Sequence, residues 1–274
     1  MNQDILHRLA SGSRLDHHAE EGVATRPGGA AAGAVGLRFS LVVPIHDEQE
    51  NVHALLAEIE AVLAPHGPFE ALLVDDGSRD ESLARMRAWK AERHAEWLRI
   101  VVLQQNSGQS AAVMAGVEVA RAAVVATMDG DLQNDPRDLP AMVDELLAGQ
   151  CDAVFGVRRR RQDTFVRRLS SRIGNAVRNW LTGDRVVDAA CGIKAIRREF
   201  WLRAPRFAGM HRFMATLVRW QGGSVREVDV NHRPRAAGRA KYGVGNRVWK
   251  GLRDCFAMRW LRARMLRHRI AGEF

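Results

Sequence analysis

Residues 125–136 read Val-Ala-Thr-Met-Asp-Gly-Asp-Leu-Gln-Asn-Asp-Pro, an apolar run that ends in two aspartates one residue apart. The apolar part has the composition of a buried strand, and ligands of α/β proteins bind beyond the carboxyl ends of parallel strands. Carboxylates such as Asp129 and Asp131 suit Mg²⁺ or Mn²⁺, which usually share their ligands with substrate phosphates. The stretch therefore predicts a metal–diphosphate site. Taken alone, such a stretch is more often a solvated turn that caps the next helix.

The size and composition of the chain indicate a globular protein. Its 274 residues suffice for a well-buried core, as one large domain or one domain with an appendage. No run approaches ~18 consecutive apolar residues, so we expect no transmembrane helix, and the N-terminus lacks the apolar core of a signal peptide. Cys151, Cys191 and Cys255 are widely spaced, which favours a reducing cytosol over a disulfide framework.

The positive charge of the chain is concentrated near its C-terminus. The formal net charge is +9, and residues 231–274 hold about twelve Lys and Arg against about two acidic residues. A basic tail suits nucleic acid, an anionic membrane surface or a phosphorylated substrate. This tail has no zinc-finger or RRM signature and no accompanying pattern of stacking aromatics, so we expect no nucleic acid partner.

Three segments differ in composition. Residues 1–36 are polar and then rich in Gly and Ala, which predicts a flexible leader. Residues 37–243 form the expected main domain, and residues 244–274 form a basic amphipathic helix. The glycines of the leader precede the first strand and lack GxGxxG spacing, so we exclude a dinucleotide fingerprint.

The first half of the main domain alternates between strand and helix patterns. Strands are predicted at 39–43, 70–74, 98–103 and 123–128, with helices at 48–63, 80–95 and 110–120 between them. This order predicts an α/β fold with a mostly parallel, Rossmann-like sheet and helices on both faces. Further helices are expected at 138–148, 165–181 and 213–220, and further strands at 153–157, 191–196 and 224–230.

Acidic residues follow three of the predicted strands. Asp47 and Glu48 follow the first strand, the pair Asp75-Asp76 follows the second, and the Asp129 stretch follows the fourth. Because a right-handed parallel sheet places these strand ends along one edge, we expect the carboxylates to line one crevice.

At this point the sequence resembles a known family. It is similar to the inverting family 2 glycosyltransferases of GT-A fold and, within them, to the polyprenyl-phosphate (dolichol- or undecaprenyl-phosphate) sugar transferases. The motifs that carry the resemblance lie between Phe39 and Tyr242: Val43–Asn51, Val74–Asp80, Asn106–Gln109, Met128–Pro136, Arg158–Asp163 and Arg235–Tyr242. The resemblance implies that residues 37–243 are a catalytic domain of GT-A type.

The resemblance implies a role for each acidic motif. Pro44, Asp47, Glu48 and Asp76 would hold the nucleoside of a nucleotide-diphosphate sugar, with Asp75 assisting or supporting the turn. Asp129, Asp131 and Gln133 would hold the metal, Mg²⁺ or Mn²⁺, and the diphosphate. The alternative readings are helix-terminal charge for Asp47 and Glu48, and a turn around Gly77 for Asp75 and Asp76.

The resemblance also implies an acceptor. A polyprenyl phosphate such as undecaprenyl phosphate is already ionised and needs positioning by cations rather than a general base. The candidate cations are Arg158, Arg161, Arg172, Arg212, Arg235 and Lys241, of which Arg158, Arg235 and Lys241 are the best candidates for phosphate contacts. We expect Arg159 and Arg160 to be surface residues. Asp188 matches an acidic position that faces the acceptor or fixes a turn.

An alternative acceptor stays open. A family 2 transferase that uses a saccharide or protein hydroxyl would need a carboxylate base near the anomeric carbon.

Two features depart from the relatives. His46 stands where they often have Asn, and we expect no C-terminal transmembrane helices, which bacterial relatives commonly carry. We expect the helix at 244–270 to lie on the inner face of the cytoplasmic membrane, with Trp249, Phe256 and Trp260 at the interface. The alternatives are a helix that packs on the sheet and a helix that binds a membrane partner protein.

Overall fold

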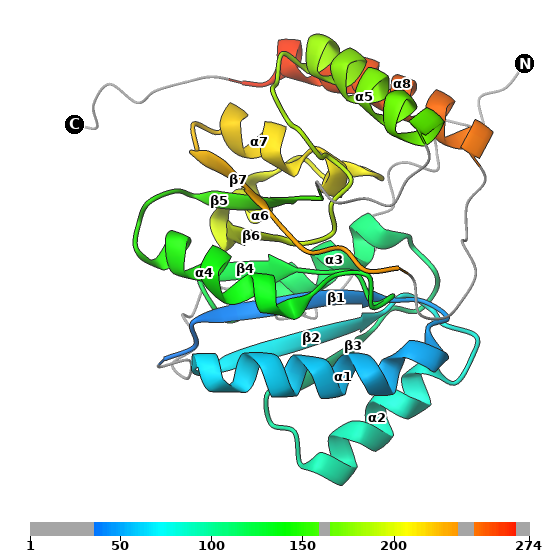
Figure 1. The fold of residues 1–274 in the computed structure, drawn as a ribbon, viewed down its shortest axis with the longest axis vertical. Helices are drawn as coiled ribbons and strands as arrows, with labels where there is room; N and C mark the ends of the chain where they lie inside the picture. The colour runs from blue at the N-terminus through cyan, green and yellow to red at the C-terminus, as the bar shows by residue number, and fades with distance from the viewer. Residues whose placement is uncertain (1–35, 159–164, 235–243, 267–274) are drawn as a thin grey trace, which may run out of the picture. The chain divides into compact units, whose positions relative to one another are not determined.

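The structure is a computed structural model that describes residues 36–158, 165–234 and 244–266, apart from the side chains of 165–173 and 244–250. The predicted leader therefore lies outside the described residues. One seven-stranded sheet, in the order β3-β2-β1-β4-β6-β5-β7, organises the described chain (Figure 1). Its strands are β1 (Phe39–Ile45), β2 (Phe69–Asp75), β3 (Leu98–Val102), β4 (Val124–Thr127), β5 (Ala153–Val157), β6 (Lys194–Arg197) and β7 (Val225–Asp229).

The helices confirm the predicted alternation. They are α1 (Gln49–Leu63), α2 (Ser82–Arg93), α3 (Gln109–Val119), α4 (Leu139–Leu147), α5 (Phe165–Thr182), α6 (Arg198–Arg203), α7 (Met214–Trp220) and α8 (Val244–Arg264). Short 3₁₀ turns occupy Ala64–His66, Pro136–Asp138 and Met210–Arg212.

The parallel half of the sheet brings three strand ends to one edge. β1 lies between β2 and β4 and is parallel to both, with Ile45 opposite Asp75. The backbone N–H of Asp76 donates to the Ile45 carbonyl at 2.8 Å. The acidic segments that follow β2, β1 and β4 therefore start from neighbouring positions, as the sequence predicts.

The other half of the sheet contains a reversed strand. β6 runs antiparallel to both β4 and β5, and it places Lys194 opposite Thr127 at the end of β4. Sequence periodicity does not encode strand direction, so the order of these strands was not predicted. The reversal brings a segment from beyond residue 190 beside the Asp129 loop.

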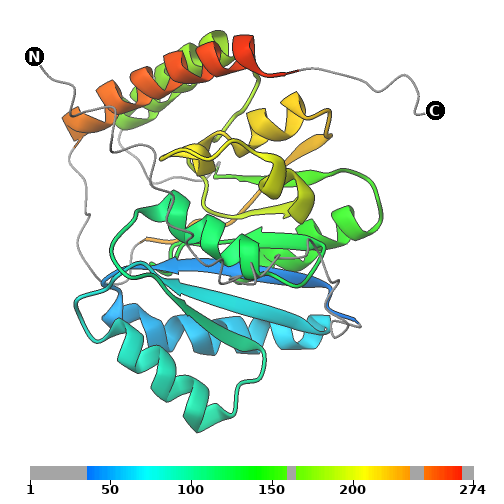
Figure 2. The same ribbon diagram turned by 180° about the vertical axis from the view of Figure 1, so that it is seen from behind.

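Alternate residues of each strand enter one of two cores. Leu41, Val43 and Ile45 pack toward α1, α2 and α4, whereas Val42 packs on the opposite face with α3, α6 and α7. This period of two follows from the pleat of a strand. Figures 1 and 2 show the two faces of the sheet with their covering helices. The expected α/β class with helices on both faces is confirmed.

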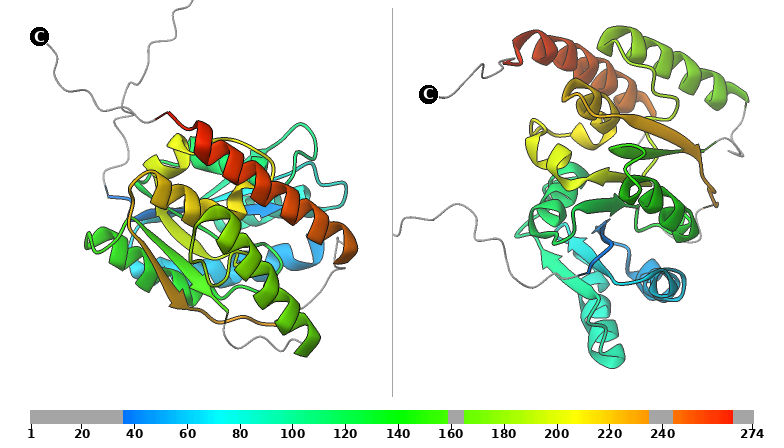
Figure 3. Two further views of the ribbon diagram at one scale, coloured as in Figure 1. Left: turned by 90° about the horizontal axis from the view of Figure 1, so that it is seen from above. Right: turned by 90° about the vertical axis from the view of Figure 1, so that its left-hand side faces the viewer.

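The C-terminal helix α8 packs on the second core by one face. Cys255 and Met258 are buried, whereas Phe256 and Trp260 are 60% and 63% exposed. α8 lies beside α5 (Figure 3), and an ion pair of 2.7 Å joins Asp254 to Arg212. None of the described helices is long and apolar enough to cross a membrane. The helix thus combines a packed face with an exposed aromatic face.

The packing of α8 can be tested through Met258, which is 1% exposed. We expect Met258→Ala to lower the free energy of unfolding by roughly 2–5 kcal/mol, because it leaves a cavity in the core. Chemical denaturation followed by circular dichroism measures this change. The matched control is Phe256→Ala on the exposed face, for which we expect a change within about 0.5 kcal/mol. Equal effects of the two substitutions would contradict the packing of α8.

Candidate functional site

The loop after β4 is built around Asp129. Its backbone N–H donates to Asn134 Oδ1 at 2.8 Å, and its Oδ1 accepts from Gln109 Nε2 at 2.8 Å. A Cβ on Gly130 would lie 2.5 Å from Ile45 Cδ1, and a Cβ on Gly192 would collide with the Asp129 carboxylate. Glycine at both positions lets three segments meet around this side chain.

The carboxylate of Asp129 is half-buried, with other charged groups around it. Burial and the neighbouring charge of Asp131 raise its pKa, while Lys194 and Arg158 oppose the rise. The negative charge of Asp131 disfavours the ionised form of Asp129. A divalent cation bound between them would relieve this repulsion.

The same loop also carries Gln133. Its backbone N–H donates to Asp131 Oδ1 at 3.2 Å, and its Nε2 donates to the Arg233 carbonyl at 3.3 Å. Leu132, which lies between Asp131 and Gln133, has a positive φ of 62°, which is uncommon for a residue with a branched side chain. Within the described residues, no group of three or more His, Cys, Asp or Glu could hold a metal. The predicted ligand set of two carboxylates and one amide oxygen still fits Mg²⁺ or Mn²⁺, because these ions take further ligands from substrate phosphates.

Asp76 organises the neighbouring loop. Its two carboxylate oxygens accept the backbone N–H groups of Ser107 and Gly108 at 2.6 and 2.9 Å. Gly108 precedes α3, whose first residue Gln109 contacts Asp129. Asp76 therefore links the end of β2 to the Asp129 loop, and its role in nucleoside binding stays a prediction.

Asp75, at the end of β2, is 2% exposed, and its Oδ1 has no hydrogen-bond partner within the described residues. Leaving such an atom unpaired is costly, so Asp75 is the stronger candidate for a contact with a ligand donor.

The loop after β1 completes this edge of the sheet. Pro44 lies in β1, with its carbonyl oxygen 3.3 Å from the position that a Cβ on Gly130 would take. Asp47 has a φ of 49°, and its Oδ1 accepts from the Arg79 backbone at 2.8 Å. Glu48 Oε2 accepts from Asn51 Nδ2 at 2.6 Å. The contact of Asp47 with Arg79 holds the first and second acidic motifs together, whereas the contact of Glu48 with Asn51 lies within the first motif.

A buried ion pair lies on the basic side of the site. Arg158 donates to Asp188 through Nε at 2.7 Å and through Nη2 at 2.9 Å. Lys194 is buried, its Nζ donates to the His211 carbonyl at 3.1 Å, and burial lowers its pKa. The charges of Arg158 and Lys194 both act on Asp129, which places these cations near the predicted metal loop.

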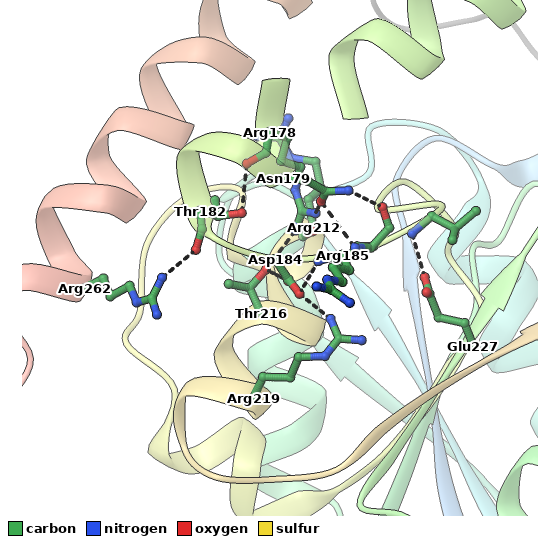
Figure 4. Close-up of polar contacts among 12 residues, drawn as sticks. Arg178, Asn179, Thr182, Asp184, Arg185, Arg212, Thr216, Arg219, Glu227 and Arg262 are labelled. Carbon is green, nitrogen blue, oxygen red and sulfur yellow. Dashed lines mark hydrogen bonds and ion pairs between the residues drawn. The ribbon is translucent and has the colours of Figure 1, made fainter. Parts of the chain in front are cut away.

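A polar network supports the segment that carries Asp188 (Figure 4). Asn179 on α5 holds the backbone of Val186 through two hydrogen bonds, and Glu227 accepts from the Val187 N–H at 2.9 Å. Asp184, at the start of this segment, pairs with Arg219 of α7. The position of Asp188 is therefore fixed by side chains from several elements.

The structure places the other predicted acceptor residues differently. Arg212 donates to Asp254 of α8 at 2.7 Å, so its guanidinium contributes to docking that helix. The side chains of Arg161 and Arg172 lie outside the described residues, as do Arg235 and Lys241. Their roles stay predictions.

Comparison with known proteins assigns the family. The family model described as "Glycosyl transferase family 2" matches residues 40–203. The chain belongs to glycosyl transferase family 2.

Named relatives refine this assignment. The chain is 39% identical over 227 residues to a dodecaprenyl-phosphate galacturonate synthase of Rhizobium johnstonii, covering 81% of this chain and 66% of the relative. It is 36% identical over 206 residues to an undecaprenyl-phosphate 4-deoxy-4-formamido-L-arabinose transferase of Pseudomonas aeruginosa, covering 75% and 60%. The chain therefore spans slightly less than two thirds of the length of these relatives.

Solved structures confirm the GT-A fold. Glucosyl-3-phosphoglycerate synthase of Mycobacterium tuberculosis, in complex with Mn²⁺ and UDP, has a TM-score of 0.61 at 20% identity, covering 82% of this chain and 79% of that one. The mannosyltransferase PcManGT of Pyrobaculum calidifontis, in complex with GDP-Man and Mn²⁺, has a TM-score of 0.58 at 21% identity, covering 82% and 64%.

Two site residues of this family 2 chain were missed in the sequence. They are Lys194 and His211, and His211 Nδ1 lies 2.6 Å from Ser110 Oγ. A lysine within the apolar stretch 191–196 is an available signal, because an unpaired charge is rarely buried. His211 carries no comparable signal, since only the folded chain brings it to α3.

The protonation of His211 gives a pH prediction. Burial, with the charges of Lys194 and Arg212, lowers its pKa to about 3, whereas an unfolded imidazole binds a proton below about pH 6.5. Acid therefore favours the unfolded chain, and this contribution to stability is lost as pH falls from about 6.5 toward 3. Its slope is at most about 1.4 kcal/mol per pH unit.

Denaturation of the wild type and of His211→Gln between pH 7 and pH 4 measures the contribution. Because glutamine does not titrate, we expect a shallower pH dependence for the variant. Parallel curves would contradict the neutral state of His211.

Proposed function

We propose that this chain transfers a sugar from a nucleotide-diphosphate sugar to a polyprenyl phosphate such as undecaprenyl phosphate, with inversion at the anomeric carbon. The main support is the loop directly after β4 of this family 2 chain, which carries Asp129 and Asp131 one residue apart. Both named relatives are polyprenyl-phosphate sugar transferases by name, which favours a lipid phosphate acceptor.

A divalent cation, Mg²⁺ or Mn²⁺, fits the donor side. Asp129, Asp131 and Gln133 would hold it, and it would offset the charge that develops on the departing diphosphate. The nucleoside would bind at the adjoining ends of β1 and β2, where the candidate residues are Pro44, Asp47, Glu48, Asp75 and Asp76.

The acceptor side favours a phosphate over a hydroxyl. Both oxygens of Asp188 accept from Arg158, which commits this carboxylate to an ion pair rather than to removal of a hydroxyl proton. A phosphate oxygen of the acceptor is already ionised and can attack the anomeric carbon directly. The new C–O bond forms as the bond from that carbon to the diphosphate breaks. Arg158, Lys194 and the predicted cations Arg161, Arg172, Arg235 and Lys241 would screen the two anions.

A transfer assay tests the proposal. We expect release of nucleotide with Mn²⁺ or Mg²⁺, a set of nucleotide sugars and undecaprenyl phosphate, and we expect Asp131→Ala to lower the rate on the order of 10²–10³-fold. Glu92→Ala, on the exposed side of α2, is the matched control and should leave the rate unchanged. Normal turnover by Asp131→Ala would contradict the metal assignment.

The same assay separates the alternative function. Soluble saccharides replace undecaprenyl phosphate in a second set of reactions. Transfer to a saccharide or protein hydroxyl, without transfer to the lipid phosphate, would favour the alternative family 2 activity.

We further propose that the chain binds the inner, cytoplasmic face of the membrane through α8 and α5. Phe256 and Trp260 lie one helical turn apart on α8, Trp180 of α5 is 75% exposed, and Arg253 is also exposed. Exposed aromatic rings with neighbouring cations suit an anionic lipid surface. The buried free thiols agree with a reducing compartment. A membrane partner protein is the alternative ligand of this face.

Vesicle flotation tests the membrane proposal. The double substitution Phe256→Ser and Trp260→Ser should weaken binding to anionic vesicles by at least about tenfold, because each buried ring contributes roughly 1.5 kcal/mol or more. Leu147→Ser, an exposed apolar residue at the end of α4, is the control. Unchanged flotation of the double variant would refute lipid contact by α8.

A further inference from the structure

The segment after β7 is bonded to the metal loop residue by residue. Asn231 donates to Asp138 through its backbone and its side chain, at 2.9 and 3.2 Å. His232 forms an antiparallel bridge with Asn134, and the Arg233 N–H donates to the Gln133 carbonyl at 2.9 Å. Residues 231–233 and 133–138 therefore behave as one unit. Figure 1 shows the chain beyond β7 crossing toward the end of the sheet at which β1 and β4 terminate.

The side chain of Arg233 fastens this unit to α1. Its guanidinium contacts both oxygens of Glu58, at 2.9 and 2.7 Å, and Asp135 Oδ2 at 2.9 Å. The hydrogen bonds that Arg233 donates to Glu58 and Asp135 raise the pKa of Arg233. Asp135 is buried, yet hydrogen bonds from Arg137 and Arg233 lower its pKa to about 2. One planar cation thus joins α1, the metal loop and the segment after β7.

The main chain of Arg233 decides how Gln133 is oriented. The amide nitrogen of Gln133 donates to the Arg233 carbonyl at 3.3 Å. An amide has one donor end and one acceptor end, so this bond assigns Oε1 to the opposite side, as an oxygen for a cation. Partners that orient a metal ligand in this way typically change metal affinity by about 10–100-fold when they are lost.

We propose that Arg233 is a positioning residue that sets the divalent-cation affinity of the site through Gln133. This inference rests on the proposed metal site, and it adds a residue to which the family resemblance assigned no role. Glu58 and Asp135 act with Arg233, because they hold its guanidinium at one place. Arg233 itself does not touch the cation.

The experiment measures binding of Mn²⁺ by the loss of the free-ion EPR signal, with and without inorganic pyrophosphate as the diphosphate probe. We expect Arg233→Ala to raise the apparent Kd for Mn²⁺ about tenfold or more, and Arg233→Lys to restore part of the affinity. Glu58→Gln weakens the ion pair that holds the Arg233 guanidinium without removing Arg233, so it should give a smaller change in the same direction. The matched control is Arg226→Ala, which removes an ion pair between Arg226 of β7 and Glu145 of α4. This variant should bind Mn²⁺ normally.

A double-mutant cycle distinguishes positioning from general destabilisation. If Arg233 acts through Gln133, the Arg233→Ala substitution should have little further effect on Mn²⁺ affinity in a Gln133→Ala background. Additive effects, or an unchanged Kd in both Arg233→Ala and Glu58→Gln, would overturn the inference.

Binding of Mn²⁺ by the wild type distinguishes failure of the proposed metal site from failure of the proposed role of Arg233. A wild-type protein that binds no Mn²⁺ even with pyrophosphate would contradict the proposed metal site, and the inference with it. If the wild type binds Mn²⁺ and the Arg233→Ala and Glu58→Gln variants bind it equally well, only the role of Arg233 would be contradicted.

Discussion

The repulsion between two carboxylates at the end of β4 is the constraint on which the rest of the site depends. Asp129 is half-buried, and its raised pKa reflects both this partial burial and the neighbouring charge of Asp131. The surroundings reduce the cost without removing it. Gln109 donates a hydrogen bond to the Asp129 carboxylate, and Asn134 accepts one from the Asp129 backbone N–H. The positive charges of Lys194 and Arg158 also act on this carboxylate. A site that concentrates negative charge in this way is suited to a divalent cation and a diphosphate.

The cations of the site are held by partners rather than left loose on the surface. Arg158 is bound to Asp188, and Arg212 is bound to Asp254 of α8. Because the residue before Arg212 is His211, whose carbonyl accepts from Lys194, the docking of α8 and the charge beside Asp129 share one short turn. The proposed membrane helix and the proposed catalytic loop are therefore connected through described contacts.

Much of the fold could be predicted from sequence because it depends on local patterns. The apolar run of β1, the helical periodicity of α1 and the acidic residues after β1, β2 and β4 are all visible in the chain, and they predicted the parallel half of the sheet. The antiparallel insertion of β6 could not be predicted, because a buried strand has the same composition in either direction. Lys194 was missed as a site residue for this reason, since its place beside Thr127 follows from that insertion.

The sequence by itself determined the family, the α/β class and the acidic motifs of the metal loop, because these depend on residue type and short spacing. Only the tertiary structure decided which of the polar side chains pair with one another. Asp76 holds the loop before α3, and Arg212 docks α8. Arg233 contacts Glu58 of α1 and Gln133, which lie 175 and 100 residues away in the chain. Such pairings depend on which segments the packed cores bring together, and a local sequence pattern holds no information about contacts between segments far apart in the chain.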